Sequence, residues 1–139
     1  MILRTYSAAV MGAMLAFISP AVVAAEATHE SVSVQFQHAL PNAAGKKLVS
    51  VIVDYPAGAR SAAHRHAKSA FIYVYVLAGS IRSQVDDEPA KVYRAGESWF
   101  EMPGAHHKVS ENASSAEPAK LLALFVVESG EALTIPDPH

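Results

Sequence analysis

Two short histidine clusters are the residues of this chain whose types and spacing could do chemistry, namely His64-Arg65-His66 and His106-His107. In an extended segment, side chains alternate between two faces, so His64 and His66 project from the same face and Arg65 from the other. Two imidazoles on one face form a chelating pair for a transition metal. An H-x-H pair also arises by chance in surface loops. The chain has no cysteine, which excludes disulfides, thiolate metal sites and cysteine nucleophiles.

Glycines and a proline stand around both clusters at spacings that are typical of one family. The stretch from 56 to 112 resembles the cupins, whose motifs read G(x)5HxH(x)3–4E(x)6G and G(x)5PxG(x)2H(x)3N. The matching residues are Gly58, His64, His66 and Gly79 in the first motif, and Gly96, Pro103, Gly104 and His107 in the second. The second motif carries one extra residue before its proline, and Asn112 is displaced by one.

The resemblance implies a fold and a ligand set. The fold is the cupin double-stranded β-helix, a conical antiparallel β-barrel or jelly roll made of two sheets. Inside it, His64, His66 and His107 would converge on one divalent metal ion. His107 takes the third position because two residues separate it from Gly104, and His106 would then face the other side, where it packs or makes a hydrogen bond at the rim. His106 remains the alternative third ligand.

The carboxylate of the first motif is missing from this sequence. The motif places a glutamate with six residues between it and Gly79, where this chain has Ile72, and counting forward from His66 finds no acid either. Residue 72 is an even number of positions from residues 64 and 66, which predicts that its apolar side chain points to the inner face. Either the site has lost its metal, or three neutral imidazoles hold it. The retention of all three histidine positions favours the second alternative.

Three neutral ligands would leave the full +2 charge on the ion, which favours an anionic ligand such as an enolate, thiolate or carboxylate. Cupins that lack the glutamate and hold iron through three histidines include thiol and diketone dioxygenases. The resemblance therefore implies Fe(II) as cofactor, with Mn, Ni, Zn or Cu as alternatives, and a dioxygenase acting on a small anionic chelating molecule. The competing hypothesis is a non-catalytic cupin module that binds a metal or a small ligand.

Glu101 is the other acid that could take part in chemistry at this site. It lies two residues before Pro103, on the segment that leads to His107, and it shares its parity with Trp99. It could serve as a fourth metal ligand or as a general base beside the metal. The alternative is a solvated charge on an edge strand.

The elements that must position these residues are short strands. No helical period is sustained, and β-rich segments alternate with Gly and Pro turns, which predicts an all-β sandwich or barrel. The predicted strands cover residues 32–36, 48–53, 71–77, 80–85, 91–93, 99–100 and 121–127. Residues 26–31 and 136–138 are predicted to be frayed ends. The segment 71–77 (FIYVYVL) offers aromatic side chains on the face opposite the metal, which predicts a homodimer.

The N-terminal segment has the pattern of a secretory signal peptide. Arg4 precedes an apolar run over 8–18, and Val23 and Ala25 suit the −3 and −1 positions of a cleavage site. We therefore expect residues 1–25 to be a signal peptide cut after Ala25, and 26–139 to be a single domain in the periplasm or secreted. No stable membrane insertion is expected after cleavage, and an uncleaved anchor is the alternative.

Charge excludes one class of partner. The formal net charge of the 139 residues is −2, and Lys46-Lys47 is the only adjacent basic pair in the sequence. Binding to nucleic acid depends on a basic patch that neutralises phosphates. We therefore expect no nucleic-acid partner, and a small anionic molecule is the predicted ligand.

Overall fold

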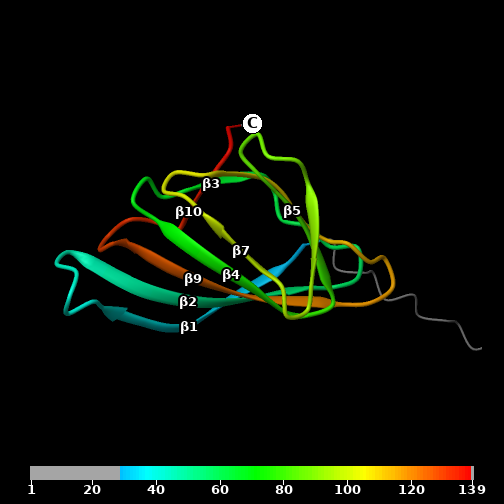
Figure 1. Ribbon diagram of the computed structural model, residues 1–139, viewed down its shortest axis with the longest axis horizontal. Helices are drawn as coiled ribbons and strands as arrows, with labels where there is room; N and C mark the ends of the chain where they lie inside the picture. The colour runs from blue at the N-terminus through cyan, green and yellow to red at the C-terminus, as the bar shows by residue number, and fades with distance from the viewer. Residues whose placement is uncertain (1–28, 139) are drawn as a thin grey trace, which may run out of the picture.

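Two antiparallel sheets make up the structure. The computed structural model describes residues 29–138, and within them the chain is all-β, with ten strands. The first sheet has the order β1 (Ser31–Ala39), β2 (Lys46–Tyr55), β9 (Ala119–Glu128), β4 (Phe71–Ala78) and β7 (Ser98–Glu101). The second has the order β10 (Thr134–Pro136), β3 (His64–His66), β8 (His106–Asn112), β5 (Ser80–Val85) and β6 (Lys91–Arg94). The predicted all-β class is confirmed (Figure 1).

The core lies between the sheets because apolar side chains occupy alternate positions of the long strands. In β4, Ile72, Val74 and Val76 are buried, whereas Phe71 and Tyr73 on the other face are exposed. Strands β2 and β9 alternate in the same way and pair along their full lengths. Each buried Val, Ile, Leu or Phe contributes roughly 1.5–3 kcal/mol relative to an exposed one. All seven strands predicted from the sequence are present.

The C-terminal segment is ordered, and the prediction that 136–138 would fray is wrong. Thr134–Pro136 forms β10 and pairs with β3, the strand that carries the first histidine cluster. The Asp137 carboxylate lies 2.7 Å from Nε2 of His106. These contacts join residues far apart in the sequence, so no local pattern could have indicated them.

The predicted signal peptide lies outside the described residues. Among residues 29–138, no helix is long and apolar enough to span a membrane.

Gly79, between β4 and β5, is a position that only glycine fits. Its φ is +68°, and a Cβ there would stand 2.5 Å from the carbonyl oxygen of Pro118 and 2.9 Å from Cα of Ala119. Gly58 also has a positive φ, of +70°, but no atom lies within 4 Å of the position its Cβ would take.

We expect Gly79→Ala to lower the free energy of unfolding by about 2–5 kcal/mol, because backbone strain and overpacking add. Gly58→Ala, with strain alone, should cost about 1–2 kcal/mol. Urea unfolding of both variants measures the difference. Equal losses would show that the close approach at Gly79 does not matter.

Candidate metal centre

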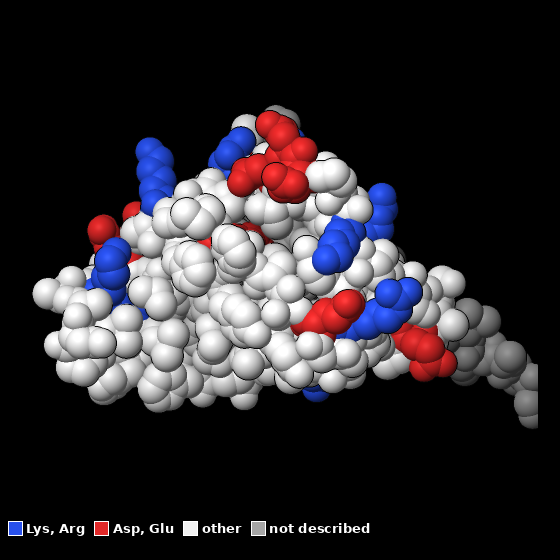
Figure 2. All heavy atoms as spheres, in the orientation of Figure 1, with Lys and Arg blue, Asp and Glu red and all other residues white. Residues whose placement is uncertain are grey.

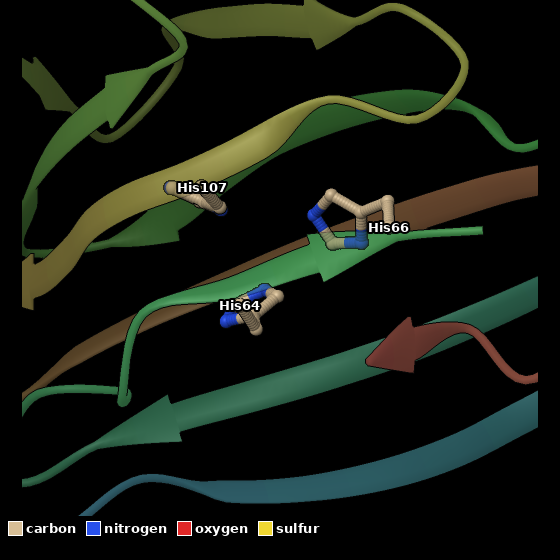
Figure 3. A group of neighbouring side chains, drawn as sticks. All are labelled: His64, His66 and His107. Carbon is tan, nitrogen blue, oxygen red and sulfur yellow. The ribbon is translucent and has the colours of Figure 1, made fainter. Parts of the chain in front are cut away.

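The pairing of β3 with β8 brings the two histidine clusters together. His64 pairs with His107 and Arg65 with His106, so His64, His66 and His107 share the face that lines the cavity. One nitrogen from each of the three rings lies within 4.8 Å of the others. Figure 3 shows the three rings grouped, two from β3 and one from the neighbouring strand β8. The structure thus brings together the three histidines that the sequence analysis singled out.

Backbone carbonyls orient the two rings of β3. Nδ1 of His64 lies 2.8 Å from the carbonyl oxygen of Ala62, and Nδ1 of His66 lies 3.2 Å from that of Leu133. A carbonyl oxygen can only accept, so each Nδ1 carries the proton. In the neutral ring this leaves the Nε2 lone pair available as a ligand, an arrangement that metal-binding histidines commonly share.

His107 has a side-chain partner instead. Its Nε2 lies 2.9 Å from the buried Ser83 hydroxyl. The adjacent His106 faces the other side, where its Nε2 contacts Asp137 and its Nδ1 lies 3.5 Å from the Arg65 guanidinium. His106 therefore makes a rim interaction and does not line the cavity.

Glu101 supplies a carboxylate to the same cluster. Only 2% of its surface is exposed, so the solvated-charge alternative is wrong. Its Oε2 lies 3.0 Å from Nε2 of His66, and its Oε1 lies 3.4 Å from Nδ1 of His107. Oε1 also accepts a hydrogen bond of 3.0 Å from the indole of Trp99.

Glu101 lies on β7, the strand that pairs with β4, whereas the motif places its glutamate on β4 itself. Ile72 is 1% exposed and points inward, as predicted, and Glu101 is its cross-strand partner in the pairing of β4 with β7. A carboxylate therefore lies beside the histidines on the strand that neighbours β4. A divalent ion held by the three histidines would therefore have this carboxylate beside it. The only sign of this in the sequence was that Glu101 lies two positions after Trp99 and so shares its face of the strand. The register in which β4 and β7 pair cannot be read from the local sequence.

Two buried atoms of the cluster lack a hydrogen-bond partner among the described residues, namely Nε2 of His66 and Oε2 of Glu101. A nitrogen lone pair facing a carboxylate oxygen at 3.0 Å repels it unless a proton or a metal ion is shared. Neighbouring ligands of one ion, each bound at about 2.1 Å, also lie roughly 3 Å apart. The residues present therefore fit a divalent ion.

The pKa values of the histidines and of Glu101 determine whether these side chains are in the forms that bind a metal. Burial lowers the pKa of His64, and it lowers the pKa of His107 to about 4. Burial raises the pKa of the Glu101 carboxyl, but the adjacent His66 and His107 rings and the hydrogen bond from the Trp99 indole together lower it by more, so that the net pKa lies below the ordinary value. At neutral pH, His64 and His107 are thus neutral and Glu101 is ionised, which are the forms that bind metals.

The depressed pKa of His107 predicts how the metal-free protein responds to acid. The unfolded chain takes up this proton near pH 6.5, whereas the folded protein takes it up only near pH 4. Stability is therefore fully present above 6.5 and is lost as the pH falls toward 4, by up to about 1.4 kcal/mol per pH unit. Urea unfolding between pH 7 and 4.5 measures the slope, which His107→Asn should flatten. An unchanged slope in that variant would contradict the assignment.

The cluster opens into a cavity of about 410 Å³ between the sheets. Its walls are mainly apolar and come from β2, β4 and β9, with Val53, Val74, Leu121 and Phe125 among the lining residues. Apolar cavities of this size with a few polar groups are typical of small-molecule sites. The arrangement can hold a metal ion and, beside it, a small molecule packed against apolar walls.

Comparison with known proteins identifies the fold. The family model of the cupin domain matches residues 51–127, which is more than half of the chain. No curated protein matches the sequence.

Several solved structures are similar. A conserved protein with a double-stranded β-helix domain from Klebsiella pneumoniae has a TM-score of 0.61 and 18% identity, with 77% of this chain and 85% of that chain covered. A cupin 2 conserved barrel protein from Rhodopseudomonas palustris has a TM-score of 0.58 and 20% identity, covering 78% and 67%. The DMSP lyase DddQ from Ruegeria pomeroyi has a TM-score of 0.59 and 19% identity, covering 78% of this chain but 51% of that chain. At such identities the likeness shows the fold alone.

Proposed function

The chain belongs to the cupin family, and we propose that it is an exported metal-dependent dioxygenase that acts on a small anionic molecule able to chelate the metal. His64, His66 and His107 would hold the ion, with Glu101 as a fourth ligand or as the general base. One observation carries the proposal: the unpartnered Nε2 of His66 and Oε2 of Glu101 lie 3.0 Å apart beside the other two imidazoles.

Charge supports the substrate class. One carboxylate against a divalent ion leaves a net charge of about +1 in a cavity with apolar walls. An anionic oxygen or sulfur of a substrate would neutralise it. The proposed metal is Fe(II), and Mn, Ni, Zn and Cu also suit a donor set of imidazoles and one carboxylate.

The residues of the chain have separate roles in this proposal. When bound, a divalent ion would supply Lewis-acid polarisation and, if it is iron, redox chemistry. Glu101 is ionised and lies within the cluster, so its carboxylate could hold a proton taken from the substrate. The apolar walls exclude water from the reacting groups.

Metal content and oxygen uptake test the proposal. The mature protein, residues 26–139, should contain close to one redox metal per chain, and after loading with Fe(II) it should consume oxygen with a diketone, a phenol or a thiol. Substoichiometric metal that is unchanged in His64→Ala would refute the metal site. Metal binding without oxygen uptake for any of these compounds would favour the non-catalytic module.

The fold does not decide between these outcomes. Fold alone does not imply function, and the similar structure from Ruegeria pomeroyi is that of a lyase. The measurement of turnover is therefore decisive. Export is proposed from residues 1–25, and the intact mass of the protein recovered outside the cytoplasm should correspond to a chain that begins at Glu26.

We also propose that a second copy of this chain covers the outer face of β4 and β7. Tyr73 pairs with Phe100 there, and the rings of Phe71 and Phe100 stack with centroids 6.0 Å apart. Phe100 is 62% exposed, and Figure 2 shows a face whose centre is largely free of charged side chains. Exposed apolar patches mark interaction sites, and an uncharged patch can pair with itself.

Phe100→Glu should convert the dimer to a monomer because it places two like charges in the interface. Light scattering at micromolar concentration measures the mass. A monomeric wild-type protein would refute the dimer.

A further inference from the structure

A second polar cluster lines the same cavity. The hydroxyl of Tyr55, at the end of β2, lies 2.8 Å from Oγ of Ser61 and 2.8 Å from Oγ of Ser110. Tyr55 and Ser110 are buried, and all three residues line the cavity. The mechanism proposed above uses none of these hydroxyls.

This cluster has more hydroxyl hydrogens than internal hydrogen bonds. Three hydroxyls carry three hydrogens, and the two contacts use two of them. Within residues 29–138, neither serine hydroxyl has another hydrogen-bond partner. One O–H therefore remains to donate. Burial raises the pKa of Tyr55, so its phenol keeps its proton at neutral pH and the cluster stays uncharged.

The walls of the cavity limit what part of a ligand can lie between the histidine cluster and the three hydroxyls. Apart from Glu30 and Thr134, the other side chains that line the cavity are aliphatic or aromatic, including Val51, Val53 and Leu121. A ligand with its anionic end at the histidines would therefore place an apolar body against these walls. Any part that reached the three hydroxyls would need an acceptor, because an unpaired polar group in such a place costs free energy.

We propose that Tyr55, Ser61 and Ser110 form a second binding point that donates a hydrogen bond to a neutral oxygen at the far end of the ligand. The inference rests on the proposed function, because the metal centre fixes the other end. The ligand would then be a small molecule with an anionic chelating head, an apolar body and a carbonyl or ether oxygen at its distal end.

Two hydroxamates that differ only at the distal group test the inference. Hydroxamates chelate divalent ions, and 4-acetylbenzohydroxamate carries a carbonyl where 4-ethylbenzohydroxamate carries a methylene. Binding of each to the metal-loaded mature protein is measured by calorimetry, together with the metal content. We expect the acetyl compound to bind about 3–10-fold more tightly, the effect of one net hydrogen bond. Tyr55→Phe and Ser110→Ala should each remove most of this preference.

Tyr73→Phe is the matched control, because it deletes the same hydroxyl from the exposed outer face of β4. It should retain the preference. Equal affinities in the wild-type protein, or a preference that survives both Tyr55→Phe and Ser110→Ala, would overturn the second binding point while leaving the metal centre intact. A wild-type protein that binds no metal, or that binds metal but neither hydroxamate, would overturn the proposed function and this inference with it.

Discussion

Replacing His107 with alanine should weaken the binding of a divalent metal by more than roughly 100-fold, since removal of an outer-shell partner alone costs 10–100-fold. The ring is buried and lies in the histidine cluster, and the loss of one imidazole leaves two that cannot enclose the ion. Titration of the metal-free protein with Fe(II) or Zn(II) under competition from a chelator measures the change.

His106→Ala is the matched control, because it removes the same side chain from the adjacent position. His106 contacts Asp137 on the opposite face of β8. Its loss should leave metal affinity within a few-fold and lower the free energy of unfolding by about 1 kcal/mol, the net worth of one hydrogen bond. If His106→Ala lost the metal and His107→Ala kept it, the register assigned to β8 would be wrong.

Replacing Glu101 with glutamine should change affinity and stability in opposite directions. Metal affinity should fall by about 10–100-fold, because an amide neither carries charge nor binds metals as strongly. The metal-free protein should gain about 1–3 kcal/mol of stability, because the amide N–H can donate to the unpartnered Nε2 of His66. Urea unfolding at pH 8 without metal measures the gain. A loss of stability there would show that a proton already joins Glu101 to His66.

The cross-strand pairing of Ile72 with Glu101 permits a sharper version of this experiment. The variant that exchanges the two side chains, Ile72→Glu with Glu101→Ile, keeps the composition and returns the carboxylate to β4. It should bind metal at least about 10-fold more tightly than the single variant Glu101→Ile, if the carboxylate itself is the contribution. Equal affinities would mean that the acid acts on its neighbours and not on the ion.

Much of the fold could be predicted because its signals are local. The β-branched and aromatic segment 71–77 and the turn at Gly79 indicate a strand and a reversal within a few residues of each other. The C-terminal strand β10 could not be predicted in this way. Thr134–Pro136 is only three residues long and ends in proline, and its pairing with β3 joins segments about 70 residues apart.

The sequence by itself determined that His64 and His66 share one face, since alternation along a strand needs no tertiary information, and the resemblance to the cupin motifs pointed to His107 as the third ligand. It also determined that Ile72 would put an apolar side chain where an acid was expected. Only the tertiary structure decided that Glu101 lies opposite Ile72, with its carboxylate beside the histidines. The register between β4 and β7 sets which side chains face each other, and register depends on the packing of the whole sheet and not on the spacing within either strand.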